Sequence, residues 1–167
     1  MRAEQAGQLE ALMKRFVAVA IAGAAFAMLI GPRGPLGGFW RPAAEAPKPQ
    51  GALLAGFVAE GIAEAIAFGI GVAILLLGRS WFASRTATPA RGTTAWLAAV
   101  WLFASWMPHA ALHLHIGLQP ERLLAVEWIF HVGAVMALAA LLWALTTNTR
   151  PAPDHTAVQR ASIGEAR

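Results

Sequence analysis

Six ionisable side chains lie inside long apolar segments of this sequence. They form three pairs whose members are four residues apart: Glu60 and Glu64, His109 and His113, and Glu127 and His131. Residues with this spacing lie on one face of a helix, so each pair can present both side chains to the same neighbour. Because ionisable groups are costly in hydrocarbon, each pair is a candidate functional site.

Carboxylates and imidazoles from facing helices are the ligands that hold transition metals in the cores of helical bundles. Three ionised carboxylates cannot share a dry pocket without compensating positive charge. Two divalent cations with a bridging hydroxide would bring the six groups close to neutrality. We expect Glu60 to act as the catalytic base. The expected ligands of the divalent metal, which would be Fe, Zn or Mn, are Glu64, His109, His113, Glu127 and His131.

Other chemistries could use the same residues. A single zinc ion held by His109, His113 and His131 would suit hydrolysis, with a glutamate as base. Axial histidines on two facing helices could instead hold b-type haem in an electron-transfer subunit, which could also be linked to quinone. A chain of Glu and His side chains could conduct protons in an ion-coupled transporter, or join helices in an accessory subunit that meets a partner or a second copy.

Several neighbours of these pairs have simpler roles. Trp106, Met107 and Trp128 flank the pairs and are expected to line a pocket. His115 lies on a different side of the helix from His113 and close to the helix end, which favours an interfacial position over a metal ligand. His155 lies in the polar C-terminal stretch, where solvation is the expected state.

Composition places the elements that carry these residues in a membrane. Hydrophobic residues make up 57% of the 167, charged residues only 13%, and mean hydropathy is +0.55. These values are typical of integral membrane proteins, and the arginines in connecting segments report topology rather than nucleic-acid binding. The chain has no cysteine, which excludes disulfides and thiolate metal sites. The expected fold is all-α: an integral membrane four-helix bundle, up-down-up-down, with helices at about 10–31, 51–78, 94–118 and 120–146.

The segments between these helices are predicted from turn and breaker residues. Pro108 should bend the third helix just before its histidines, and Pro120 fits the first position of the fourth, after a short outer turn. Thr93 or Thr94 is the expected N-cap of the third helix, following a basic connector. A Pro/Gly-rich loop covers 31–50. Residues 1–147 would form the transmembrane domain and 148–167 a disordered cytoplasmic tail.

The first apolar run, 16–30, is also compatible with a signal peptide, because Lys14 and Arg15 precede it. Glu4 and Glu10 are atypical of a signal sequence, so we favour a retained helix.

Orientation and depth bring the three pairs together. The N-terminal segment, the 79–93 connector and the tail hold nine of the Lys and Arg residues, against four on the other side. The positive-inside rule then places both termini in the cytoplasm of a bacterial-type inner or plasma membrane. At 1.5 Å per residue, all six side chains lie about 6 to 20 Å below the outer ends of their helices. We therefore expect one metal-dependent membrane enzyme site, an oxidoreductase or hydrolase acting on a small or lipid-soluble substrate.

Overall fold

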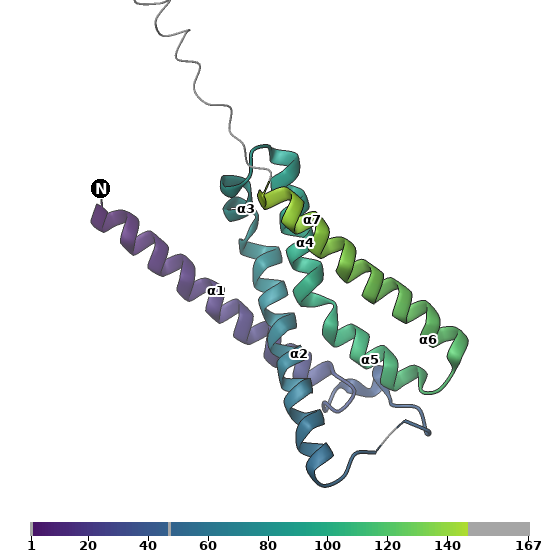
Figure 1. Ribbon diagram of the computed structural model, residues 1–167. Helices are drawn as coiled ribbons and strands as arrows, with labels where there is room; N and C mark the ends of the chain where they lie inside the picture. The colour runs from purple at the N-terminus through teal and green to yellow at the C-terminus, as the bar shows by residue number, and fades with distance from the viewer. Residues whose placement is uncertain (1, 47, 147–167) are drawn as a thin grey trace, which may run out of the picture.

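The computed structural model describes residues 2–46 and 48–146, and the regular elements in this part of the chain are helices (Figure 1). No strand occurs among the described residues. In chain order the elements are α1 (Arg2–Ile30), the 3-10 helix η1 (Gly37–Trp40), α2 (Ala52–Leu77), α3 (Arg79–Arg85), α4 (Pro89–Ala104), α5 (Trp106–Ile116), α6 (Pro120–Glu127), the π-helical turn η2 (Trp128–Val132) and α7 (Gly133–Thr146). The predicted tail, 148–167, and His155 lie outside the described residues.

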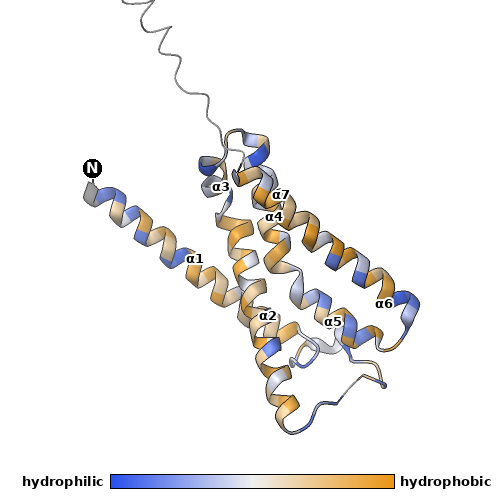
Figure 2. Cartoon of the chain, viewed as in Figure 1, coloured by the Kyte–Doolittle hydropathy of each residue, from blue (hydrophilic) through white to orange (hydrophobic). Residues whose placement is uncertain are grey.

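Three of the helical stretches are long and apolar enough to cross a membrane: Glu4–Ile30, Ala52–Leu77 and the continuous run Pro120–Thr146. A fourth span is formed if α4 and α5 are taken as one broken helix, bent by 42°. These findings confirm the expected all-helical chain with several apolar segments. Figure 2 shows apolar residues along α2, α4 and α7, and polar residues gathered at α3 and around α5 and α6.

Small residues fill the interior, while large apolar side chains point outward. The residues with almost no exposed surface are alanines, among them Ala65, Ala73, Ala95, Ala111 and Ala144. Outward-facing side chains such as Leu54, Leu76 and Val135 are 47%, 64% and 68% exposed. This is the reverse of a water-soluble core and the pattern by which membrane helices approach each other closely.

Glycine sets the closest helix contact. A Cβ atom added at Gly23 would lie 2.9 Å from Cα of Gly69, and one added at Gly69 would collide with the backbone oxygen of Ala20. Further along the same pair, Ala27 packs beside Ala65. Residue numbers rise along α1 as they fall along α2, so the two helices are antiparallel. A larger residue at Gly23 or Gly69 would force the helices apart.

Helix starts differ from the predicted ones for identifiable reasons. α1 begins at Arg2 rather than near residue 10, because residues 2–9 are mostly good helix formers. α4 begins at Pro89: the side chain of Thr88 accepts a hydrogen bond from the backbone N–H of Arg91, and proline occupies the first turn. The predicted cap at Thr93 or Thr94 is therefore wrong. The basic connector 79–93 contains the short helix α3.

The predicted bend is present between α4 and α5. The helix breaks at Ser105, three residues before Pro108. Proline has no N–H, so the carbonyl of Ala104 loses its helical donor, and the proline ring crowds the same carbonyl. α5 therefore leaves α4 at an angle and carries His109 and His113 with it.

Residues 31–43, called the cap below, form an ordered structure at the C-terminal end of α1. The N–H of Leu36 donates to the oxygen of Leu29 at 2.9 Å, and the N–H of Ala43 donates to the oxygen of Leu114 at 2.9 Å. Nδ1 of His115 lies 3.0 Å from the oxygen of Arg41. The cap is thus fixed both to α1 and to the end of α5.

The turn between α5 and α6 depends on Gly117, which is buried and has a φ of 65°. A Cβ there would lie 2.7 Å from Cβ of Ala43 and 2.7 Å from Oε1 of Glu45. We expect Gly117→Ala to destabilise the fold by about 1–2 kcal/mol, because an L-residue is strained in this conformation. Thermal unfolding in detergent would measure it. Gly38→Ala, where an added Cβ meets nothing within 4 Å, is the control; equal stability of both variants would contradict the prediction.

Candidate functional site

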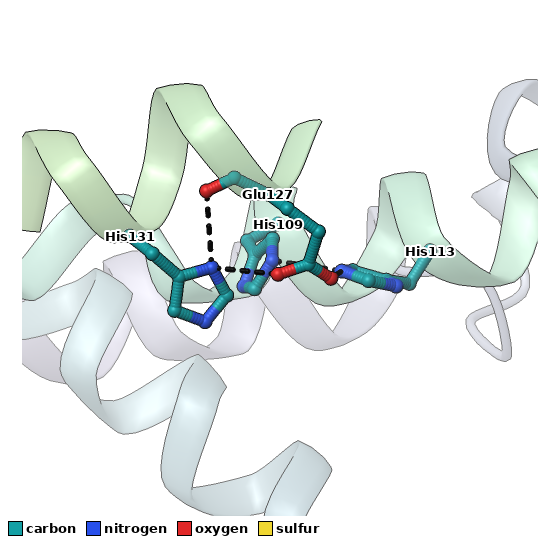
Figure 3. A network of polar contacts seen from close by, with 4 residues as sticks. All are labelled: His109, His113, Glu127 and His131. Atoms are coloured by element: carbon teal, nitrogen blue, oxygen red, sulfur yellow. Dashed lines mark hydrogen bonds and ion pairs between the residues drawn. The ribbon is translucent and has the colours of Figure 1, made fainter. Parts of the chain in front are cut away.

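Four of the six predicted side chains meet between α5 and the helix that follows it (Figure 3). α5 contributes His109 and His113, one turn apart. Glu127 ends α6, and His131 lies in η2. Figure 3 shows the Glu127 carboxylate between the rings of His113 and His131, with His109 beside them. We call these four residues the His/Glu cluster.

Glu127 is the centre of the His/Glu cluster. Its Oε1 lies 2.9 Å from Nε2 of His113, and its Oε2 lies 2.8 Å from Nδ1 of His131. The same Nδ1 is 3.1 Å from the backbone oxygen of Glu127. Because both neighbours of this Nδ1 are acceptors, Nδ1 carries the hydrogen, and His131 orients the carboxylate by donating to it.

The π-helical turn positions His131. In a π-helix the backbone hydrogen bonds skip one residue further than in an α-helix, which adds a residue to the turn. Such turns occur frequently at functional sites, and this one contains the residue that holds the central carboxylate. Nothing in the apolar run 128–146 distinguishes a π-turn from an ordinary α-turn, so sequence reasoning missed it.

Three potential ligand atoms converge on one point. One ligand atom each from His109, His113 and Glu127 lies within 4.8 Å of the others. Nε2 of His113 is 2.8 Å from Nε2 of His109, as well as 2.9 Å from the carboxylate. A ring nitrogen carries at most one hydrogen, so His113 cannot form a good hydrogen bond with both neighbours at once. A cation between the three atoms would satisfy them all.

Aromatic rings hold the His109 imidazole in place. Phe130 stacks on it with ring centroids 4.8 Å apart. Trp101 in turn stacks on Phe130, with ring centroids 5.8 Å apart. Gly133 leaves room for this arrangement, since a Cβ there would lie 2.9 Å from the Trp101 ring. Sequence reasoning did not select Phe130 or Trp101, although Phe130 directly precedes His131 in the chain.

A cavity of about 510 Å³ lies beside His109 and His113. Its walls come from the end of α1, the cap, the first half of α2, and α5. Trp106 and Met107 of α5 line it, as do Glu60 and Glu64 of α2. Glu60 is exposed and Glu64 half-buried.

The two α2 carboxylates are separate from the His/Glu cluster. Within the described part of the chain, no hydrogen bond or ion pair joins Glu60 or Glu64 to any of its four residues. Trp128, expected to line a pocket, is 63% exposed and absent from the cavity wall. His115 binds the carbonyl of Arg41, away from the cluster.

The donor atoms of the cluster fit a divalent transition metal. Two histidines one helical turn apart and a carboxylate from a facing helix form the His₂Glu set of catalytic zinc sites and the two-histidine, one-carboxylate set of non-haem iron sites. Ligand atoms around a tetrahedral zinc ion lie about 3.3 Å apart, so the observed 2.8 and 2.9 Å contacts need to open by about 0.5 Å. His109 and His113 also face the cavity, where a further ligand could enter.

His131→Ala is expected to weaken metal binding about 10–100-fold without removing the site, because His131 orients the ligand Glu127 rather than supplying a fourth donor. Titration of metal-free protein in detergent against a competing chromophoric chelator would measure the change. Complete loss of binding would show instead that His131 ligates the metal directly.

Comparisons with known proteins identify no relative: no family model matches the chain, and neither a curated protein nor a solved structure matches it. The function is therefore inferred from the site.

Proposed function

We propose that this protein is a metal-dependent membrane enzyme that binds one divalent transition metal through His109, His113 and Glu127. The observation that carries the proposal is the convergence of their ligand atoms within 4.8 Å, beside a cavity large enough for a small substrate. His131 orients the carboxylate, and the open side of the site faces the cavity.

In the proposed topology the chain spans the membrane four times, up-down-up-down, with α4 and α5 as one bent span. Both termini are cytoplasmic, and the cap and the turn between α5 and α6 lie outside. The lengths and hydropathy of the spans and the nine-to-four distribution of Lys and Arg support this arrangement. The site then lies in the outer half of the bilayer.

One ion is favoured over two. A dinuclear centre would need the carboxylates of Glu60 and Glu64 among the ligands, yet only His109, His113 and Glu127 form a group of ligand spacing among the described residues. From the cavity wall Glu60 and Glu64 can instead accept protons from a metal-activated water or from substrate.

The metal determines the reaction. Zinc in a His₂Glu site lowers the pKa of bound water and supports hydrolysis, whereas iron with the same ligands supports oxidation with O₂. Elemental analysis of detergent-purified protein is the test. About one equivalent of Zn, Fe or Mn per chain is expected, and protein that stays metal-free after exposure to all three would overturn the proposal.

The geometry disfavours b-type haem. A haem between His109 and His131 would need a porphyrin between rings whose centroids are 5.0 Å apart and nearly perpendicular, at 83°. His113, the other candidate axial ligand on α5, is already in contact with the Glu127 carboxylate. An optical spectrum of the purified protein checks this, since a Soret band would revive the haem assignment.

The runner-up function is a proton relay. One observation favours it: His109, His113, Glu127 and His131 form an unbroken chain of contacts between 2.8 and 2.9 Å. Proton flux in liposomes that contain metal-free protein would support this alternative, and its absence would leave the metal site.

A further inference from the structure

The wall of the cavity beside the proposed metal site has two parts, the cap and an apolar rim. Gly31 and Gly34 of the cap contribute to its wall, and the cap is fixed to α1 and α5 by backbone hydrogen bonds. The rest of the wall carries large apolar side chains that are partly exposed: Met28, Val58, Ile62 and Trp106 are 55%, 47%, 42% and 43% exposed. In a bilayer these side chains face acyl chains, so the cavity is accessible from the side.

The formal charges around the cavity sum to zero with a divalent ion bound, when the carboxylates are counted as ionised and the histidines as neutral. Its wall carries the carboxylates of Glu60 and Glu64 and the guanidinium of Arg33, which lies 5.4 Å above the ring of Phe57. These three groups sum to −1. A divalent ion with the Glu127 carboxylate adds +1, and the total is zero. A charged substrate would therefore bring an uncompensated charge into an apolar space, which is costly.

From these two features, and on the basis of the proposed metal site, we propose that the cavity admits an uncharged lipid-soluble molecule laterally from the bilayer. Its apolar chain lies along the first half of α2, and its oxygen-bearing group (an ester, carbonyl or hydroxyl) is directed to His109 and His113. This occupant matches the apolar rim and the zero formal charge.

The chain offers a direct test because it has no cysteine of its own. A single cysteine at Ala110, which lines the cavity, would be labelled with N-ethylmaleimide in nanodiscs in the presence of decanol, decanoate or decylammonium. Decanol is expected to slow labelling of the metal-loaded protein. The two charged probes are expected to protect about tenfold less well, because each brings an uncompensated charge into the cavity. A tenfold loss of affinity corresponds to about 1.4 kcal/mol.

A cysteine at Ala125, which is exposed on α6 and outside the cavity wall, controls for partition into the bilayer. Equal protection at Ala125 and Ala110, equal protection by all three probes, or no protection at all would each overturn the inference.

Two glycines of α2 provide matched blocking variants. An added Cβ meets nothing within 4 Å at Gly61, which lines the cavity, or at Gly56, which does not. In the Ala110→Cys background, Gly61→Trp should abolish protection by decanol, whereas Gly56→Trp should leave it unchanged. Protection that survives Gly61→Trp would overturn the inference, because the probe would then bind elsewhere.

Metal content, measured in the same samples, separates this inference from the proposed function. If metal binds but decanol does not protect, the substrate assignment fails and the metal site stands. If decanol protects a protein that never holds metal, the metal site fails and the assignment of an uncharged lipid-soluble ligand stands. Without metal, and with the histidines neutral, the two carboxylates of the cavity wall and that of Glu127 stand against one guanidinium, a formal charge of −2, so chelator treatment should shift the preference toward decylammonium.

Discussion

The His113→Ala variant is expected to bind the metal at least about 100-fold more weakly. Changing a residue that only orients a ligand weakens metal binding about 10–100-fold, so the loss at His113 should be larger. His113 is the ligand with the most contacts, since its Nε2 touches both other ligand atoms of the site. Elemental analysis and chelator competition on detergent-purified protein would measure the loss.

His115→Ala is the matched control. It removes an imidazole from the same helix two residues further on, but that ring binds the carbonyl of Arg41 and not the cluster. Equal metal content in the two variants would mean that His113 is not a ligand. Glu64→Gln adds a second comparison: it should retain the ion if the centre is mononuclear, and loss of metal would return Glu64 to the ligand set.

Gly69→Leu is expected to separate α1 from α2 and to destabilise the fold by about 3 kcal/mol or more, because a side chain at Gly69 collides with the α1 backbone rather than with a flexible neighbour. Unfolding by SDS, followed by circular dichroism in mixed micelles, would measure the change. Gly61→Leu, which places the same side chain in open space on the same helix, should have little effect.

The proposed metal site gives this experiment a second readout. Its candidate ligands lie on α5 and α6, whereas α1 supplies part of the cavity wall. Gly69→Leu protein that remains folded should therefore keep its metal and lose protection of a cysteine at Ala110. Loss of metal in this variant would show that metal binding on α5 and α6 depends on the packing of α1.

The helical segments and most of their ends, other than the starts of α1 and α4, could be predicted because hydrophobic runs and proline act locally. The last span, Pro120–Thr146, covers the predicted residues, and Pro108 produces a bend at the expected place. The short turn at Gly117 places the end of α5 beside the start of the next helix, so His109 and His113, eight and four residues before Gly117, come near Glu127, ten residues after it.

The relation of Glu60 and Glu64 to the His/Glu cluster could not be obtained in the same way. Residue counting gives the height of a side chain along a helix axis, but neither its direction around that axis nor the distance between helices. The α2 carboxylates are on the wall of the same cavity as His109, as depth suggested, yet among the described residues no hydrogen bond or ion pair joins them to the His/Glu cluster. The π-turn and the ordered cap depend on tertiary contacts, such as that between Ala43 and Leu114, which no local pattern encodes.

The two attachment points of the cap have a consequence for specificity. Leu36 is bonded to the end of α1 and Ala43 to the end of α5, so the chain between them bridges two walls of the cavity. The number of residues between Leu36 and Ala43 limits how far the two walls can separate. Inserting or deleting residues there would resize the space and the molecules it accepts, while every metal ligand stayed in place.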